Sequence, residues 1–550
     1  MPALSSLFRR LSLGVALMLP AFPAAAKAPF RVIYNNDTVN VTECTSPWHG
    51  KGEPFREEML KASIDEAVDA GVDAYFLQPG LTAVPFWKSA IYPPAEHFRW
   101  WQETFQGKLH EFGTYLLGGG DVVAVFVEHC RSRHVAPFIS LRVNDYHMVE
   151  YLDVPAGSKL PPFASLGLDR FRRERPDLRI AATAQDDSDG FKTRDLRVLD
   201  WRKPEVRARL LGFINEVCAY DIDGLELDFL RHFRLFPPGG TTRAERVSIV
   251  TGFVWEVRQI LDRSERDGRH RWLCLRLPAV EKVREALGLD IPSLAVAGVE
   301  MFNLSSHYYT IQQDLDVAAV RAQARDATIY LEMTHVTAVG NDPDRKYGDA
   351  DFYRRTTDEQ FTTTAHLALA RGADGVSLFN FAYYREYGGK PERGPFCEPP
   401  FHVIRQLADR AALGRLPQDY FLAPVWRSPY DIPLQLPMSL SPDRTRETTL
   451  DLAPPEGGWR GHGLLRVQAE KPFGAGQITA RFNGIALQPA ESVAEPYPSP
   501  YPQMLGTPAT LRGWQVPVEI LRDGINRITW TADAGIEARV IFVDLALPGK

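Results

Sequence analysis

The sequence has few cysteines, no long apolar segment in its main body and no strong excess of charge of either sign. Five of its 550 residues are cysteine, and no cysteine–histidine spacing resembles a zinc site. After the first 26 residues, no segment approaches the roughly 20 apolar residues that a membrane-spanning helix needs. The net charge is −6, with 63 basic residues scattered among 69 acidic ones. The composition therefore indicates neither a nucleic-acid-binding surface nor an integral membrane segment in the mature chain.

Residues 1–26 have the layout of a secretory signal peptide. Arg9 and Arg10 precede a short apolar run, Leu11 to Leu19, and three alanines at 24–26 offer a small-residue cleavage site. We expect the mature chain to begin near Lys27 and to work outside the cytoplasm, either secreted or periplasmic.

From Pro29 to about Leu413, short apolar runs alternate with amphipathic helical stretches. This alternation predicts a parallel sheet covered by helices. Eight strands are expected, at Phe30–Asn35, Ala74–Gln78, Ala136–Val143, Gly224–Arg231, Trp272–Pro278, Val299–Ser305, Thr328–Met333 and Gly375–Phe381. Helices are expected at Arg56–Ala70, Asp121–Arg133, Pro204–Ala219, Ala244–Arg263, Asp358–Arg371 and Phe401–Leu413.

Eight such units predict an α/β fold, a (β/α)8 TIM barrel over residues 27–420. The alternative is a doubly wound open sheet, which usually has a glycine-rich turn after its first strand, and none follows the first strand here. Residues 421–550 show short alternating runs and an Asn483-Gly484 turn, which predict a C-terminal β-sandwich. The sequence does not decide whether that domain supports the barrel or binds sugar.

The cysteines divide into two groups. Cys130, Cys218 and Cys274 lie in apolar stretches and are expected to be inert core residues. Cys44 and Cys397 lie in polar loops after the first and last barrel strands, which are neighbours in a closed barrel. A disulfide between these two is compatible with that geometry in an oxidising compartment.

The fourth predicted strand carries two acids, Glu226 and Asp228, separated by one residue. Side chains alternate along a strand, so both point to the same face while their apolar neighbours point to the other. Because helices cover the outside of a barrel, the acids must face its interior, where unpaired carboxylates are costly. They are therefore either functional or a buried pair satisfied by Arg142 or Arg276 on neighbouring strands.

Glu332 lies near the end of the seventh strand, across the barrel from the fourth. Glycoside hydrolysis uses two carboxylates on opposite sides of one bond, about 5 Å apart for retention and roughly 6.5–9.5 Å apart for inversion. Asp228 or Glu226 together with Glu332 fits that arrangement in topology. A Glu332 that only binds an arginine or the backbone is the structural alternative.

Other strand ends carry polar or aromatic residues, which would form a polar mouth suited to a hydroxyl-rich substrate. The candidate substrate-binding residues are Asn36, Arg142, Asn144, Arg231, His232, His307, Tyr308 and His335. A metal site of His307, His335 and acids has no supporting spacing, and we expect neither a metal nor a cofactor.

Two segments together resemble a known family. They are Leu199-Asp200-Trp201-Arg202-Lys203-Pro204-Glu205-Val206-Arg207 and Tyr220-Asp221-Ile222-Asp223-Gly224-Leu225-Glu226-Leu227-Asp228. They resemble the helix-then-strand signature of bacterial (β/α)8 glycosidases described as family-10-like or glycosyl-hydrolase-like. The resemblance implies a scaffold role for Asp223-Gly224 and matches Asp228 to the acid at the strand's end. Phe229-Leu230-Arg231-His232 stands where those relatives often carry a second aspartate.

The sequence therefore predicts a secreted glycoside hydrolase that cleaves an oligosaccharide or polysaccharide with a carboxylate pair. Two alternatives come from other classes. The first is a carbohydrate-binding barrel without catalysis, and the second is a lyase or a metal-dependent hydrolase on the same fold.

Overall fold

The structure, a computed structural model, describes most of the chain after residue 26. The described ranges are 27–42, 46–50, 52–81, 84–181, 195–232, 234–306, 309–313, 315–338, 353–385, 398–424, 435–442, 444–474, 476–493 and 510–550. The predicted signal peptide lies outside them. In the described part of the chain, no helix combines the length and the apolar character needed to cross a membrane.

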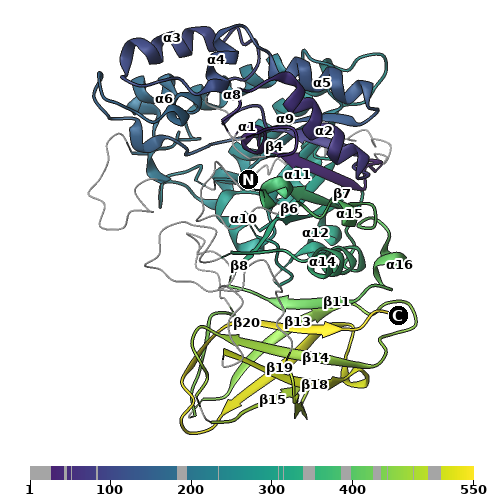
Figure 1. Cartoon of the computed structure of the whole chain (residues 1–550). Helices are drawn as coiled ribbons and strands as arrows, with labels where there is room; N and C mark the ends of the chain where they lie inside the picture. The colour runs from purple at the N-terminus through teal and green to yellow at the C-terminus, as the bar shows by residue number, and fades with distance from the viewer. Residues whose placement is uncertain are drawn as a thin grey trace, which may run out of the picture.

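Eight parallel strands close into a barrel in the order β1-β10-β7-β6-β5-β4-β3-β2 (Figure 1). They are β1 (Val32–Asn36), β2 (Ala74–Leu77), β3 (Ala136–Arg142), β4 (Gly224–Asp228), β5 (Trp272–Pro278), β6 (Met301–Ser305), β7 (Thr328–Thr334) and β10 (Gly375–Phe379). The predicted TIM barrel is confirmed, and the open doubly wound sheet is wrong because β1 pairs with both β2 and β10.

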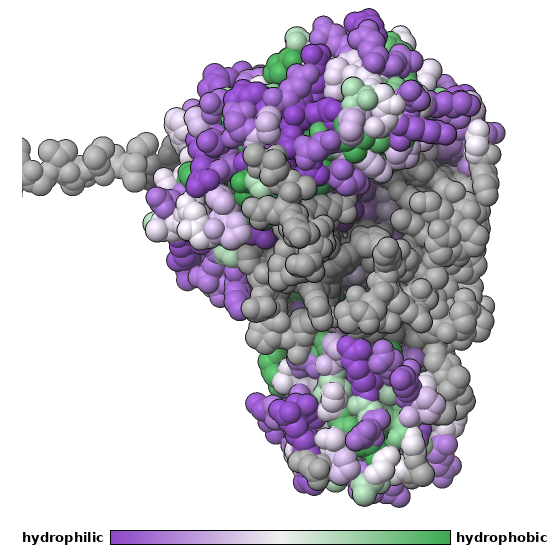
Figure 2. All heavy atoms as spheres, turned by 90° about the vertical axis from the view of Figure 1, so that its left-hand side faces the viewer, coloured by the Kyte–Doolittle hydropathy of each residue, from purple (hydrophilic) through white to green (hydrophobic). Residues whose placement is uncertain are grey.

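Helices follow the strands and cover the outside of the barrel. The longer ones are α2 (Glu57–Asp69), α3 (Pro94–Thr104), α4 (Glu111–Leu117), α5 (Val122–Ser132), α8 (Pro204–Val217), α9 (Arg243–Arg263), α10 (Glu281–Leu287), α12 (Val317–Gln323) and α14 (Asp358–Ala370). The shorter ones are α1 (Val39–Thr42), α6 (Arg170–Glu174), α11 (Ile291–Val296), α15 (Phe401–Ile404) and α16 (Arg410–Leu413). Hydrophilic side chains predominate on the described barrel surface seen in Figure 2.

Two predicted elements differ from the sequence pattern. The fourth strand stops at Asp228, because its carboxylate accepts the backbone N–H groups of Leu230 and Arg231 and removes them from the sheet. The predicted helix 401–413 is wrong as a single element. It is divided into α15 and α16, and the Asp409 side chain caps α16 by accepting the N–H groups of Ala411 and Ala412.

The C-terminal part is the predicted β-sandwich, built from two antiparallel sheets. The first contains β11 (Gln418–Leu422), β12 (Met438–Leu440), β14 (His462–Ala469), β17 (Gln488–Pro489), β18 (Leu511–Pro517) and β20 (Ala538–Leu547). The second contains β13 (Arg446–Leu452), β15 (Ile478–Phe482), β16 (Ile485–Ala486) and β19 (Gly524–Ala532). The sheets share one apolar core, in which the rings of Trp514 and Trp530 lie 5.5 Å apart, one from each sheet.

The barrel covers the open edge of β11. Gln312 donates to the carbonyl of Asp419 and accepts the N–H of Phe421, and Gln313 makes the same two kinds of contact with Ala423. Side-chain amides of the barrel thus stand where a neighbouring strand would pair, which protects an otherwise exposed sheet edge. Figure 1 shows β11 on the side of the sandwich that faces α14.

Candidate active site

The inside of the barrel changes from apolar to charged along the strands. One apolar cluster inside it contains Ile33, Ala74, Phe76, Phe138, Cys274, Met301 and Tyr330. Glu226 borders this cluster, with its Oε2 3.6 Å from Cys274 Sγ, and Asp228 lies two residues further along, at the carboxyl end of β4. The outward residues Leu225, Leu227 and Phe229 belong to the large apolar core shared with the helices. The predicted alternation along this strand is confirmed.

Two residues at the start of β4 fix its position. The Asp223 carboxylate accepts two hydrogen bonds from Arg131 on α5, at 2.8 and 2.7 Å. A Cβ on Gly224 would lie 2.2 Å from the Phe138 ring and 2.6 Å from the Trp272 carbonyl oxygen. Only glycine allows so close an approach of three strands. The scaffold role expected for Asp223-Gly224 follows from these contacts.

Arg276 on β5 joins Asp228 and Glu332. Its Nη1 lies 3.0 Å from Asp228 Oδ2, and its Nε and Nη2 donate to the two oxygens of Glu332 at 2.8 and 2.5 Å. Both carboxylates are buried, and the Arg276 guanidinium lies 4.2 Å from the centre of the Phe379 ring. Burial lowers the pKa of Arg276, but Asp228 and Glu332 outweigh it and raise that pKa above its ordinary value. Asp228 and Glu332, which come from opposite sides of the barrel, therefore bind the same guanidinium.

Glu332 is further held by two side chains of β6. Ser305 donates to Glu332 Oε1 at 2.6 Å, and Asn303 donates to Oε2 at 3.3 Å. With the two bonds from Arg276, both of its oxygens accept hydrogen bonds, and its side chain has no exposed surface. Such a set of contacts fixes the orientation of the carboxylate and of the guanidinium that it binds.

Glu226 sits in a polar pocket of its own. Its Oε1 accepts hydrogen bonds from Asn35 and Ser140, each at 2.7 Å, and its Oε2 accepts one from Asn303 at 3.1 Å. Burial and the nearby charge of Asp228 raise the pKa of Glu226 to about 7, although Arg276 opposes the shift. The cluster thus contains a carboxyl group that titrates near neutral pH beside two that are paired with a guanidinium.

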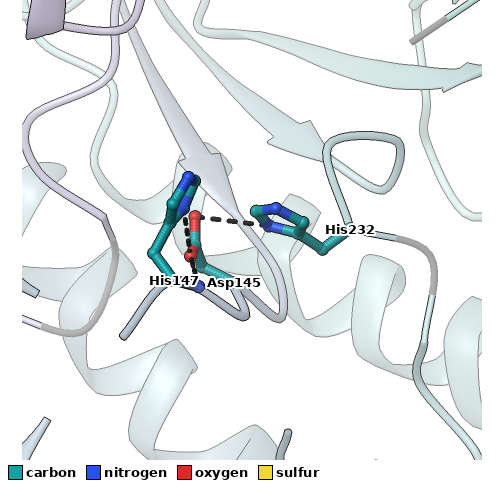
Figure 3. A group of neighbouring side chains, drawn as sticks. All are labelled: Asp145, His147 and His232. Atoms are coloured by element: carbon teal, nitrogen blue, oxygen red, sulfur yellow. Dashed lines mark hydrogen bonds and ion pairs between the residues drawn. The ribbon is translucent and has the colours of Figure 1, made fainter. Parts of the chain in front are cut away.

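A second cluster lies at the rim, beyond the ends of β3 and β4. Asp145 Oδ1 is 2.7 Å from His147 Nδ1 and accepts the His147 backbone N–H at 2.6 Å. Asp145 Oδ2 is 2.8 Å from Arg142 Nη1 and 3.4 Å from His232 Nδ1. Figure 3 shows both imidazoles turned toward this carboxylate. Burial raises the pKa of Asp145, but His147, His232 and Arg142 outweigh burial and bring the pKa well below its ordinary value.

The rim cluster has the ligand types of a metal site but a poor electrostatic fit. The ligand atoms of Asp145, His147 and His232 lie within 4.8 Å of one another. However, Arg142 Nη1 is already bound to Asp145 and lies 3.4 Å from His147 Nδ1. A divalent cation there would sit beside a guanidinium that competes for the same oxygen. His232 Nδ1 also accepts the Tyr146 N–H, at 3.3 Å, so the lone pair of that nitrogen is not available to a metal ion.

The other predicted substrate-binding residues divide by their surroundings. Arg142, Arg231 and His232 lie around Asp145 and His147 at the rim. Asn36 is buried and donates to the Tyr75 hydroxyl, and Asn144 binds main-chain groups at 199 and 234. His335 is also buried, with its ring centre 5.3 Å from that of Tyr383. His307, Tyr308, Cys44 and Cys397 lie outside the described residues.

The sequence pattern did not single out His147, Asn303 or Ser305. Asn303 and Ser305 occupy inward positions of β6 and could have been found from its alternation. His147 follows β3 by five residues, and only the Asn144-Asp145-Tyr146-His147 run of polar and aromatic residues marks it. Cys130, Cys218 and Cys274 are free and buried, as expected.

No protein-family model and no curated protein matches the chain. The chain is similar to several solved structures. Alpha-L-fucosidase isoenzyme 1 from Paenibacillus thiaminolyticus is 12% identical with a TM-score of 0.33, over 92% of this chain and 97% of that one. Chitinase ChiA74 from Bacillus thuringiensis is 10% identical with a TM-score of 0.37, over 95% and 98%. Gamma-CGTase from alkalophilic Bacillus clarkii is 11% identical with a TM-score of 0.35, over 94% and 79%. The fold assignment itself rests on the strand order of the barrel.

Proposed function

We propose that the chain hydrolyses a glycosidic bond in an oligosaccharide or polysaccharide at the carboxyl-end mouth of the barrel. The single observation that carries the proposal is the cluster of Glu226, Asp228 and Glu332 around Arg276. Active sites of TIM barrels lie at this end, and carboxyl groups with different protonation in one site are typical of acid–base chemistry on sugars. We further propose that the protein acts after export, secreted or in the periplasm, as residues 1–26 predict.

In this proposal Asp228 is the carboxylate that meets the sugar. It lies at the end of β4, and its Oδ2 has one lone pair beyond the one that Arg276 uses. A sugar ring develops positive charge as its glycosidic bond breaks, so an adjacent anion stabilises the transition state and attacks the anomeric carbon. Glu332 would hold Arg276 in place, Glu226 would support both from below, and Arg142, Arg231 and His232 would line the rim.

The test is hydrolysis by Asp228 variants of the full mature chain on a panel of polysaccharides and aryl glycosides. We expect Asp228→Asn to lower kcat/KM by about 10³-fold or more, because the nucleophile is lost. Asp228→Glu keeps the charge beside Arg276 but displaces the carboxylate by a methylene, and we expect a loss of about 10²-fold. This second variant separates loss of the reacting group from loss of the ion pair.

The matched control is Asp262→Asn on the surface of α9, where the side chain is 49% exposed and pairs with Arg258. It should retain the wild-type rate. Circular dichroism and thermal unfolding would report whether each variant is folded. Wild-type turnover by Asp228→Asn would contradict the proposal, and so would glycan binding without product across the whole panel for the wild-type protein.

A further inference from the structure

The rim cluster contains a histidine that is oriented by a buried carboxylate and has a partly exposed ring. The His147 side chain is 24% exposed, whereas the Asp145 side chain is 2% exposed. Asp145 Oδ1 lies 2.7 Å from Nδ1, closer than the 3.4 Å from Arg142 Nη1. The Nδ1 proton therefore points to Asp145, which places the lone pair of the neutral ring on Nε2.

Two links connect this histidine to Asp228. Arg142, which contacts both Asp145 and His147, is the register partner of Asp228 on the neighbouring strand. Arg231 donates its backbone N–H to Asp228 at 2.9 Å, and its charge acts on the His147 ring. The exposed imidazole and the carboxylate at the end of β4 thus belong to one corner of the mouth.

We propose that His147, oriented by Asp145, is the acid–base catalyst of the glycosidic cleavage, with Asp228 as the nucleophile. The inference rests on the proposed function. Among the described carboxyl groups beside Asp228, neither Glu332 nor Glu226 is placed to serve the leaving group, because each of their oxygens already accepts two hydrogen bonds. Of the two imidazoles in the rim cluster, His232 is buried and His147 is the partly exposed one.

The cleavage proceeds in two steps. In the first, an Asp228 oxygen bonds to the anomeric carbon, the glycosidic C–O bond breaks, and the departing oxygen takes the Nε2 proton of the His147 imidazolium. In the second, neutral His147 takes a proton from water, the water oxygen bonds to the anomeric carbon, and the bond to Asp228 breaks. The imidazolium and the free carboxylate are then restored.

The charges around the ring set the pH dependence. Burial lowers the pKa of His147, Asp145 opposes this shift, and Arg142 and Arg231 add to it. Tyr146 and His232 also pack near the ring, and Arg172 donates to the His147 carbonyl. Because the first step needs the imidazolium, kcat/KM should fall as pH rises through the pKa of His147, on the acidic side of 6.5.

The experiment compares His147→Gln with wild type on an unactivated oligosaccharide and on the nitrophenyl glycoside of the same sugar. We expect a loss in kcat/KM of about 10²–10⁴-fold on the oligosaccharide. The nitrophenyl glycoside should lose less, because nitrophenolate leaves without a proton. Azide, which needs no general base, should restore turnover of that substrate and give a glycosyl azide. His462→Gln, an exposed position at the start of β14, is the matched control.

Asp145→Asn tests the positioning role through the pH profile. Removing this carboxylate removes the interaction that opposes the lowered pKa of His147, so the falling limb of kcat/KM should move to lower pH. Equal losses on both substrates for His147→Gln, without azide rescue, would overturn the inference while leaving Asp228 in place. Loss of activity with a chelator and recovery with Zn²⁺ would also overturn it in favour of a metal site. Absence of any hydrolysis by wild type would overturn both proposals.

Discussion

At the scale of single residues, Arg276 sets the electrostatics of the barrel mouth. It binds Asp228 on one side and both oxygens of Glu332 on the other, while Glu226 lies one level below. Replacing one partner of such a buried ion pair typically destabilises a protein by about 3–5 kcal/mol, because the other charge is left unpaired. The charges of this cluster therefore contribute to the free energy of unfolding as well as to the proposed chemistry.

Glu226 gives a pH-dependent prediction. Its pKa is raised from 4.5 to about 7 in the folded chain, so the folded state holds a proton that the unfolded chain releases in this window. Stability should fall as pH rises from about 4.5 to 7 by an amount on the order of 2–3 kcal/mol. Glu226→Gln removes this dependence, because an amide does not titrate in this range.

The measurement is denaturant unfolding of wild type and Glu226→Gln at a series of pH values. The free energy of unfolding of Glu226→Gln, relative to that of wild type, should increase between pH 4.5 and 7 and then stay constant above that range. Glu174→Gln, at an exposed position on α6, controls for the loss of one carboxylate. Parallel pH curves for wild type and Glu226→Gln would show that Glu226 does not titrate in this window.

At the scale of elements, β4 depends on the absence of a side chain at its first residue. A Cβ at Gly224 would lie 2.2 Å from the Phe138 ring and 2.6 Å from the Trp272 carbonyl oxygen. We expect Gly224→Ala to destabilise the fold by about 3 kcal/mol, because backbone and ring must move apart in a packed barrel. The displacement would also shift Asp228, four residues along the same strand.

The matched control is Gly252→Ala within α9, where no atom lies within 4 Å of the added Cβ. That change should stabilise the chain by about 0.5–1 kcal/mol, because alanine is the better helix former. Chemical denaturation of both variants measures the two opposite effects. Equal stabilities of Gly224→Ala and wild type would mean that β4 tolerates the side chain and that its position is not fixed by this contact.

The order of the elements follows from local patterns, while their ends depend on tertiary contacts. The eight strands could be predicted because strands buried on both faces read as apolar runs. The end of β4 could not, since it depends on Asp228 accepting two backbone N–H groups. Similarly, β10 ends before Asn380, whose left-handed φ of 53° turns the chain. In both places the deviation from regular structure lies at the mouth.

The candidate site could be predicted in part for a related reason. Inward acids on β4 are visible in the sequence because alternation assigns each residue to a face. Which cation they share is not visible, because Arg142 and Arg276 occupy equivalent registers on the two strands that flank Asp228. In the structure Arg276 forms ion pairs with Asp228 and Glu332, whereas Arg142 forms ion pairs with Asp145 and Asp37. Which carboxylates each arginine binds therefore depends on tertiary contacts at the carboxyl end of the barrel.

At the scale of the whole molecule, the barrel and the sandwich are joined through β11. Gln312 and Gln313 satisfy the main chain at its open edge, and Arg371 at the end of α14 binds the Asp451 carboxylate with two nitrogens. These contacts hold the sandwich against the outside of the barrel, beside α14.

Cleavage in ¹⁸O-labelled water is the direct test of whether the barrel mouth hydrolyses a glycosidic bond. Wild-type protein would be incubated with a glycan that it cleaves, and the products analysed by mass spectrometry. A control incubation of the finished products in the same water would measure exchange at the reducing end. We predict that enzymatic cleavage places ¹⁸O at the new reducing end beyond that exchange, and that Asp228→Asn forms the labelled product more slowly, by about 10³-fold or more. An unsaturated product without the label would contradict hydrolysis.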